Sequence, residues 1–492
     1  MNKPIIHTGP VSKSLLLVNG AVALIYFSWW FNPSHIGNPI LYFALFFGEI
    51  YHVAMAILFW YTLWPKTKVD PKVEIQMSFQ PSVAVFITVA GEPVEIVKKT
   101  VQAAKNMHYE NFKVFILNDG YVAKKSDWKD MEILAQELHV GCITRKKPGG
   151  AKAGNINNAL RETKSVYVAI FDADMAPYPD FLEKVIPYFT DEKMGFVQTP
   201  QYYLNHEKND ITAGAWEQQE FFFGPVMKGK DRNNSAFICG TNVVIRKSAL
   251  VQAGGMCETN IAEDFLTSLF IHQNGWKSKY LTEVFATGLA PEDLLSYYKQ
   301  QLRWARGSLE ILFSENPLFK RNVTAGQRMQ YLSSSLYYFN GFIVLIDMIM
   351  PLFALFYAIT PVSASTTSFA LFFIPFMFFN LYTLYVASAG RITFRAISYS
   401  QSSWTLQLKA LQAVLLRQKT TFAVTPKQMQ QGSFSFLAYP HIMYILIGFA
   451  AIGSGIYREG FSASVAANTA WVMFNAIMFL PFINASFRKS SI

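Results

Sequence analysis

Acidic residues are confined almost entirely to one part of this chain, and long uncharged stretches occupy much of the rest. Of the 33 Asp and Glu residues, only Glu49, Asp347 and Glu459 lie outside residues 65–335. No Lys, Arg, Asp or Glu occurs between residues 348 and 390. Because a charged side chain is costly in hydrocarbon, this division predicts a water-exposed central block between membrane-embedded flanks.

Six apolar segments have about the length that a membrane-spanning helix needs, roughly 20 residues. They are residues 15–31, 40–63, two spans within 336–390 divided near 360–368, 437–457 and 464–486. The segment 391–433 has apolar residues at helical spacing (Leu406, Leu408, Leu411, Val414, Leu415). That spacing predicts either an amphipathic helix in the membrane interface or a plain connecting helix.

The basic residues predict the orientation of these spans, because Lys and Arg concentrate in cytoplasmic loops. They gather at the N-terminus, at the C-terminus and in residues 391–433, whereas the loops near 32–39 and 360–368 have none. We therefore expect a plasma-membrane protein whose termini and central block are cytoplasmic. The net charge of +10 is explained by this topology, so no nucleic acid partner is expected. The three cysteines show no disulfide or metal-binding spacing.

Strands and helices alternate along the central block. Short β-branched runs predict strands at 82–90, 112–118 and 166–171 and in "GCITR", with helices across 94–107, 127–138 and 152–162. This alternation favours a mostly parallel sheet, and such sheets bind ligands at the carboxyl ends of their strands. Asp119 and Asp172 both follow strands at such ends.

Asp172 and Asp174, one residue apart in "FDADM", could share a divalent cation with a diphosphate, since carboxylate oxygens suit Mg²⁺ or Mn²⁺. The alternative is a turn that the aspartates cap. In "IAEDF", Glu263 or Asp264 could act as a general base, or the two acids could simply favour a helix N-terminus.

Residues 300–304 read Gln-x-x-Arg-Trp. On a helix, Gln300 and Arg303 face the same way. Arg303 suits a diphosphate leaving group, and Trp304 offers a flat face to a sugar ring. The alternative is an amphipathic helix at the membrane surface.

Taken together, these motifs resemble those of the processive membrane glycosyltransferases of family 2, the cellulose synthase-like enzymes. The order matches: Asp119 in "LNDG", Asp172 and Asp174, "TPQYY", "FICGTN", "AEDF" and Gln300-x-x-Arg303-Trp304. The motif "FAVTPK" at 422–427 also fits the gating-loop pattern of cellulose synthases. One departure is Ala262, where the family usually has Thr.

The resemblance implies a role for each motif residue. Asp119 and Lys152 would contact the uridine part of a UDP-sugar, and Gln300 and Arg303 the diphosphate. Asp172 and Asp174 would hold Mg²⁺ or Mn²⁺, with Asp172 also counted among the donor-binding residues. Asp264 would be the catalytic base, beside Glu263. Trp304 and Cys239 would line the acceptor site. The gating-loop residues would be Phe422, Val424, Thr425 and Lys427.

The implied fold is an α/β GT-A nucleotide-sugar domain inserted between transmembrane helices. The expected layout is two N-terminal spans in 1–64, a cytoplasmic GT-A domain with interface helices in 65–335, spans 3 and 4 in 336–390, an interface helix with the gating loop in 391–433, and spans 5 and 6 in 434–492.

The implied function is inverting, processive transfer of glucose from UDP-glucose into a β-glucan that leaves through the chain's own channel. Synthesis of another polysaccharide, such as an N-acetylglucosamine polymer, and non-processive transfer to a polyprenyl phosphate are the alternatives. The expected partners are the UDP-sugar, the growing polysaccharide and the bilayer, with accessory secretion subunits or further copies of the chain as open additions.

Overall fold

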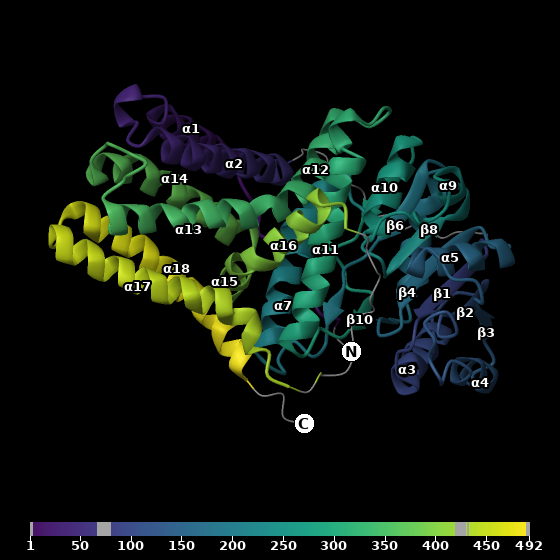
Figure 1. The fold of residues 1–492 in the computed structure, drawn as a ribbon. Coiled ribbons are helices and arrows are strands. Elements are labelled where there is room, and N and C mark those ends of the chain that lie inside the picture. The colour runs from purple at the N-terminus through teal and green to yellow at the C-terminus, as the bar shows by residue number, and fades with distance from the viewer. Residues whose placement is uncertain (1–2, 66–79, 419–429, 431, 489–492) are drawn as a thin grey trace.

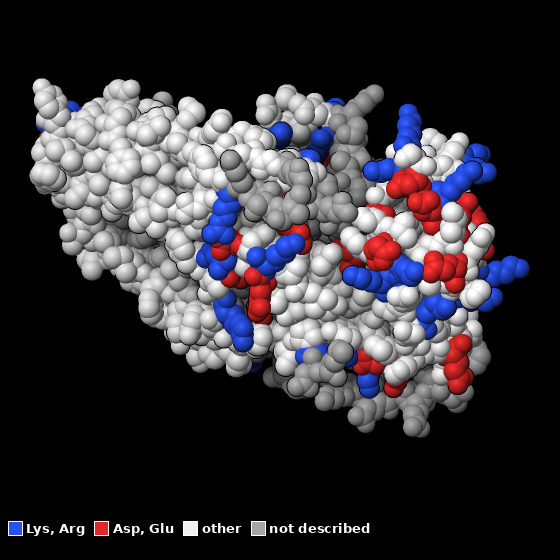
Figure 2. Space-filling view, turned by 90° about the horizontal axis from the view of Figure 1, so that it is seen from below, with Lys and Arg blue, Asp and Glu red and all other residues white. Residues whose placement is uncertain are grey.

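The computed structural model separates the chain into a helical part and an α/β part, which lie at opposite ends of the molecule (Figure 1). It describes residues 3–65, 80–418, 430 and 432–488. Charged side chains gather over the α/β part and the junction, while the helical end is almost free of them on the face in Figure 2. The predicted division between a charged block and apolar flanks is therefore visible in three dimensions.

A seven-stranded sheet in the order β3-β2-β1-β4-β8-β6-β9 organises the α/β part. The first four strands are parallel to one another, and β8 is antiparallel to both of its neighbours. Their bounds are β1 Val83–Val89, β2 Phe112–Asn118, β3 Gly141–Thr144, β4 Tyr167–Asp172, β6 Met194–Gln198, β8 Val243–Arg246 and β9 Lys277–Tyr280. The alternation of strands and helices predicted the four parallel strands, each within two residues at either end.

Helices cover both faces of this sheet because alternate residues of each strand point to opposite sides. Val83, Val85 and Ile87 of β1 pack in one apolar cluster with α3 (Val94–Lys105) and α4 (Asp130–Glu137). Ala84 and Phe86 pack on the other face with α5 (Ala151–Glu162). All seven residues of β1 are buried, so this strand reads as a continuous apolar run rather than an alternating one.

A second, three-stranded sheet lies beside the carboxyl end of β4. It contains β5 (Ala176–Pro177), β10 (Ala286–Gly288) and β7 (Tyr202–Tyr203), in that order. The Gly288 backbone lies against Asp174, since a Cβ on this glycine would come within 2.9 Å of the Asp174 carbonyl oxygen. This small sheet therefore holds the turn that carries Asp174.

The apolar flanks form helices that match the predicted spans. They are α1 Lys13–Trp29, α2 Pro39–Leu63, α13 Asn340–Tyr357, α14 Thr366–Ala387, α17 Tyr439–Glu459 and α18 Ala463–Phe487. Among the described residues, five helical segments are long and apolar enough to cross a membrane, and α1, with 17 residues, is shorter. At 1.5 Å per residue α1 is about 26 Å long, so the prediction of six spans is met in five cases and approached in the sixth.

The segment 391–433 folds differently from a single interface helix. Its described part contains two helices, α15 (Phe394–Ser402) and α16 (Trp404–Leu415). The apolar face of α16, with Leu406 and Leu411 buried, packs against α11 (Leu294–Ser314). The two helices are divided at Ser403, whose ψ of −1° departs from the regular helical value. Helix α16 uses its apolar face to contact protein.

Both described ends of the chain contact residues of the central block. Lys3 pairs with Asp180, and Ile5 forms a β-bridge with Glu283. Arg488, after α18, lies 2.6 Å from Asp210 at the start of α7 (Asp210–Phe221). Both described ends therefore lie on the same side of the apolar helices as the α/β part.

A buried lysine joins the α/β part to the helices that lead into the membrane. Lys230, in α8 (Met227–Asp231), is 1% exposed and donates to the Gln330 carbonyl oxygen at 2.6 Å and to Ser333 Oγ at 3.1 Å. Both acceptors belong to α12 (Ala325–Leu336). Gln330 Oε1 in turn accepts from Thr62 near the end of α2. Burial lowers the pKa of Lys230 from 10.5 to about 7.

This pKa predicts a specific pH dependence of stability. Between pH 7 and 10.5 the unfolded lysine holds a proton that the folded one has released, so stability rises with pH, by up to about 1.4 kcal/mol per pH unit. Lys230→Met should remove that slope, as measured by thermal unfolding in detergent between pH 7 and 9. The exposed-lysine variant Lys193→Met should keep it, and an unchanged slope in Lys230→Met would contradict the assignment.

Candidate active site

The predicted aspartates meet at one edge of the large sheet. Asp119 follows β2 and Asp172 ends β4, and these two strands flank β1. In the sheet register Thr88 of β1 pairs with Asp172, and Val89 pairs with Asn118. Parallel strands of similar length end together, which brings residues far apart in the sequence to the same edge. Loops and helices that carry the remaining motif residues surround this edge.

Asp119 is held by an arginine that the sequence patterns did not single out. Arg145, directly after β3, donates to both carboxylate oxygens of Asp119, at 2.7 Å and 2.6 Å. Both side chains are at most 10% exposed, and a paired, bidentate geometry is what makes such burial tolerable. Arg145 also donates to the Ala151 carbonyl oxygen at 3.0 Å. The sequence offered one signal for Arg145, namely its position at the end of the predicted strand that precedes the helix at 152–162.

Lys152 lies between the aspartate pair and the catalytic-base candidates. Its ammonium group pairs with Asp172 and donates to the Gly240 carbonyl oxygen at 2.7 Å. Burial by itself would lower the pKa of Lys152, but the carboxylates of Asp172, Glu263 and Asp264 outweigh it and raise the pKa above its usual value. Lys152 therefore stays protonated and provides a cation at the centre of the site.

Asp172 is oriented by two threonines. Thr88 Oγ1 lies 3.3 Å from Asp172 Oδ1, and the Asp172 backbone N–H donates to Thr241 Oγ1 at 2.9 Å. Thr241, in the "FICGTN" loop, is fully buried. The sequence pointed to this loop as one of the family-like motifs, but it gave no sign of the contact with Asp172. Thr241 thus ties the loop before β8 to the carboxyl end of β4.

Asp172 and Asp174 provide donors that suit a hard divalent cation. Asp174 is 5% exposed, and the Leu289 N–H lies 3.4 Å from its Oδ2. Among the described residues, no group of three or more His, Cys, Asp and Glu side chains gathers as a metal site. Two protein carboxylates, with the remaining positions filled by phosphate oxygens and water, are the usual set for Mg²⁺ bound with a phosphate substrate. The residues therefore fit a cation that arrives with a diphosphate.

Glu263 and Asp264 begin α10 (Glu263–Gln273), facing Lys152. Asp264 Oδ1 accepts from the Phe265 N–H at 2.7 Å. Burial raises the pKa of Asp264, although the charges of Lys152 and Arg303 oppose it. Burial and the neighbouring Asp264 also raise the pKa of Glu263. A carboxylate with a raised pKa is a better proton acceptor, as a general base needs to be.

Gly240 lets these groups come together. Its φ of +78° lies in the left-handed region that glycine adopts without strain. A Cβ at this position would lie 3.2 Å from Asp264 Oδ2 and 3.5 Å from Lys152 Nζ. The preceding residue, Cys239, donates its N–H to Gln198 at 2.9 Å. Burial, followed by the charge of Asp264, raises the pKa of the Cys239 thiol well above its usual value.

The Gln300-x-x-Arg303-Trp304 motif lies on α11, which crosses the junction between the two parts (Figure 1). Gln300 is 9% exposed, while Arg303 and Trp304 are partly exposed. The charges of Asp174, Asp172 and Arg303 all act on the hydroxyl of Tyr203, in the "TPQYY" motif. That hydroxyl donates to Gln201 at 3.5 Å. Tyr203 is thus the common neighbour of the α11 motif and the aspartate pair.

Close backbone contact fixes α11 against the start of α10. A Cβ on Gly307 would lie 2.6 Å from the Ala262 Cβ and 2.8 Å from the Ala262 backbone nitrogen. Ala262 is the residue immediately before the two acids of α10. Small side chains at both positions therefore set the distance between the candidate base and the arginine helix.

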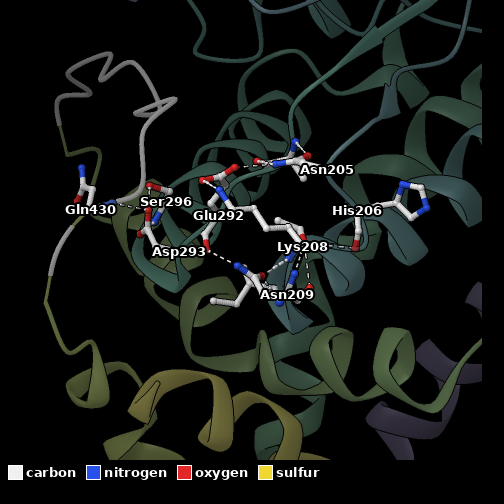
Figure 3. A network of polar contacts seen from close by, with 11 residues as sticks. Asn205, His206, Lys208, Asn209, Glu292, Asp293, Ser296 and Gln430 are labelled. Atoms are coloured by element: carbon white, nitrogen blue, oxygen red, sulfur yellow. Dashed lines mark hydrogen bonds and ion pairs between the residues drawn. The ribbon is translucent and has the colours of Figure 1, made fainter. Parts of the chain in front are cut away.

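A polar network orders the entry into α11 (Figure 3). Asp293, 1% exposed, accepts from the Ser296 N–H and hydroxyl, both at 2.8 Å, and from the Gln430 N–H at 3.1 Å. Glu292 accepts from Lys208 at 2.7 Å, and its carbonyl oxygen accepts from Asn209, which caps α7. One network therefore caps both α7 and α11. The predicted gating-loop residues, Phe422, Val424, Thr425 and Lys427, lie outside the described residues.

Comparisons with known proteins show which families the chain resembles. Residues 81–307 match the model of the Glycosyltransferase like family 2, and residues 252–404 match that of Cellulose synthase. The UDP-forming cellulose synthase catalytic subunit of Pseudomonas fluorescens (strain SBW25) is 29% identical over 96% of this chain. That of Xanthomonas axonopodis pv. citri (strain 306) is 33% identical over 64% of this chain. The chain spans 66% and 44% of the lengths of these two relatives.

A solved structure supports the fold. The mannosyltransferase of Pyrobaculum calidifontis, determined with GDP-Man and Mn²⁺, superposes with a TM-score of 0.54 at 14% sequence identity. The match covers 77% of this chain and all of that one. The predicted GT-A architecture is thus confirmed.

The contact between Gly307 and Ala262 predicts a compensating pair of variants. Gly307→Ala should destabilise the protein by about 1–3 kcal/mol through overpacking, although alanine is the better helix former. It should also reduce catalytic turnover at least about tenfold by moving α11 away from α10. Adding Ala262→Gly removes the nearer contact, with the Ala262 Cβ, but keeps the contact with the backbone nitrogen at 2.8 Å. The double variant should therefore recover part of the lost stability and part of the lost turnover, as measured by thermal unfolding and by the rate of the reaction. No recovery in the double variant would count against this contact.

The raised pKa values of Glu263 and Asp264 predict the acid limb of the activity profile. A base must be deprotonated, so turnover should fall as pH drops through the raised pKa, at a pH above the ordinary carboxylate value of about 4. Asp264→Asn should be inactive at every pH. Glu459→Gln, far from the site, should keep the wild-type profile. An acid limb centred near pH 4 in the wild type would contradict this prediction.

Proposed function

We propose that this chain, whose residues 81–307 carry a family 2 glycosyltransferase domain, is a membrane-embedded synthase of a β-glucan. The donor is UDP-glucose, transfer is processive, and each step inverts the anomeric configuration. The observation that carries the proposal is the meeting of Asp172, Lys152 and Asp264 around Gly240. The relatives named as UDP-forming cellulose synthases support the donor and the product.

The donor's diphosphate would bind at the carboxyl edge of the large sheet. Asp172 and Asp174 would hold Mg²⁺ or Mn²⁺, which neutralises diphosphate charge when bound. The Mn²⁺ in the mannosyltransferase complex, whose fold this chain shares, supports a divalent ion. Arg303 and Gln300 would contact the diphosphate from α11. Asp119, held by Arg145, would face the nucleoside with Lys152 nearby.

The acceptor would enter from the side of α10 and α11. Asp264 would take the proton of the acceptor hydroxyl as its oxygen attacks the anomeric carbon of the donor glucose. The bond between that carbon and the diphosphate oxygen breaks, and the electron pair leaves with UDP. Trp304 and Cys239 would border the acceptor glucose. Arg303 and Lys152 stabilise the charge that develops on the leaving group, which is worth most in a water-poor site.

The apolar helices explain why such a domain would be fused to a membrane. A hydroxyl-rich polymer cannot cross hydrocarbon unaided, and the α/β part lies directly beside the apolar helices. We place the α/β part and both termini in the cytoplasm and the helices in the plasma membrane. The product would then leave through the helical part.

The proposal is tested with purified protein in lipid vesicles given UDP-glucose and Mg²⁺ or Mn²⁺. Wild type should release UDP and form a glucan that linkage analysis and β-glucanases identify. Asp174→Asn should lower UDP release at least about 100-fold because a metal ligand is lost, while its thermal unfolding stays close to wild type.

Glu459→Gln serves as the matched acidic control and should remain active. Chelation of divalent ions should abolish turnover in the wild type. Absence of UDP release from UDP-glucose by the wild type would refute the proposed donor, and activity that survives chelation would refute the metal assignment.

A further inference from the structure

A cavity of about 390 Å³ lies outside the candidate active site. Its walls come from α7 and the loop before it, from α15, and from the residue that follows α18. The lining residues that carry the argument are Glu207, Asp210, Trp216, Glu217, Arg395 and Arg488. A volume of this size is in the range of small-ligand sites. None of the residues that line the cavity belongs to the motifs at the sheet edge, so this is a separate site.

The cavity lies at the level where the apolar helices end. Arg488 directly follows α18, and Arg395 is in the first turn of α15, the helix after α14. In Figure 2, side chains of both charges gather where the uncharged helical end meets the rest of the molecule. In a bilayer the phosphate groups lie in the layer just outside the hydrocarbon. The two arginines are therefore placed at the level of lipid headgroups.

An exposed phenylalanine directly precedes each of these arginines. Phe394 is 52% exposed and Phe487 is 54% exposed. A large apolar ring gains free energy by leaving water, and aromatic side chains beside cationic ones are typical of surfaces that lie in the membrane interface. The pairs Phe394-Arg395 and Phe487-Arg488 therefore indicate a surface that contacts both acyl chains and headgroups.

Ion pairs hold both arginines at the cavity. Asp210 lies 3.0 Å from Arg395 Nη1 and 2.6 Å from Arg488 Nη1. Glu217 Oε2 lies 3.6 Å from Arg395 Nε and accepts from the Thr393 hydroxyl at 2.6 Å. A guanidinium group has five N–H donors, and these contacts among the described residues use only some of them. The arginines can therefore bind a further acceptor without giving up Asp210.

The balance of charge favours a ligand that has both signs. Three carboxylates (Glu207, Asp210, Glu217) and two guanidinium groups line the cavity. A free anion would meet the carboxylates, and a free cation would meet the guanidinium groups, so each would be partly repelled. A zwitterion can place its anionic group on the arginines and its cationic group beside the carboxylates. Trp216 also lines the cavity, and an aromatic ring attracts an ammonium group.

We propose that this cavity binds the headgroup of a zwitterionic phospholipid from the cytoplasmic leaflet. Arg395 and Arg488 hold the phosphate through charge-assisted hydrogen bonds. Glu207 and Glu217 face the ammonium group, and the acyl chains extend along the apolar helices into the bilayer. The bound lipid joins the end of α18 to α7 and α15. This inference depends on the proposed placement of the apolar helices in the membrane and not on the chemistry at the sheet edge.

The experiment uses the full chain, purified in detergent and depleted of lipid. Phosphatidylethanolamine is compared with phosphatidylglycerol, with diacylglycerol of the same acyl chains and with inorganic phosphate. Native mass spectrometry measures the bound lipid, and thermal unfolding measures the stabilisation. We expect phosphatidylethanolamine to bind most tightly and to raise the unfolding temperature most.

The arginine variants test the phosphate contact. Arg395→Gln and Arg488→Gln should each weaken the binding of phosphatidylethanolamine at least about tenfold, because a charge-assisted hydrogen bond is lost. Arg161→Gln, which changes an exposed arginine of α5, is the matched control and should bind lipid like the wild type.

A carboxylate variant separates headgroup binding from a structural role. The Glu207 side chain is 90% exposed, so Glu207→Gln should fold like the wild type. It should narrow the preference for phosphatidylethanolamine over phosphatidylglycerol, because one fewer carboxylate faces the anionic headgroup. A merely structural role of this residue would leave that preference unchanged.

Three results would overturn the proposal. The first is equal binding of phosphatidylethanolamine by the wild type and both arginine variants. The second is equal binding of diacylglycerol, which would assign the lipid to acyl-chain contacts alone. The third is equal stabilisation by inorganic phosphate, which would replace the lipid by a free anion. None of these measurements needs UDP-glucose, so a failure of the proposed function is recognised separately by the absence of UDP release.

Discussion

The pairing of Lys152 with Asp172 is the interaction on which the candidate site depends. Asp172, Glu263 and Asp264 all act on this one ammonium group. Carboxylates that meet in a buried place repel one another and are protonated unless a cation lies among them. Lys152 provides that cation from the second residue of α5, and Gly240 leaves the space it needs. Arg145 does the same for Asp119 two strands away.

Close packing and a second buried lysine hold the α/β part against the apolar helices. Helix α11 packs against α10 at Gly307, where only small side chains fit, and against α16 along its length. Lys230 joins α8 to α12, the helix that continues into α13. The site and the apolar helices are therefore connected through rigid helices and close contacts.

The sequence predicted the secondary-structure elements better than it predicted the contacts between side chains. The strands at Val83–Val89 and Phe112–Asn118 were expected almost residue for residue, because buried parallel strands are short apolar runs. The roles proposed for Asp119, Asp172 and Asp264 came from the resemblance of the motif order to a known family, and the family matches support that resemblance. Arg145 and Thr241 were missed, because a lone arginine or threonine at the end of a strand carries no pattern. The segment 391–433 was expected to contain one helix and the gating loop, and the break between α15 and α16 at Ser403 had no signal in the sequence.

The sequence by itself determined that a charged α/β block lies between apolar helices, since hydrocarbon excludes the charges that water accepts. It also determined which residue types could do chemistry there. Only the tertiary structure decided which of them meet: Lys152 with Asp172, Arg145 with Asp119, and His52 with Asp347. These partners are 20, 26 and 295 residues apart. Such pairs depend on strand order and helix packing, which local periodicity does not encode.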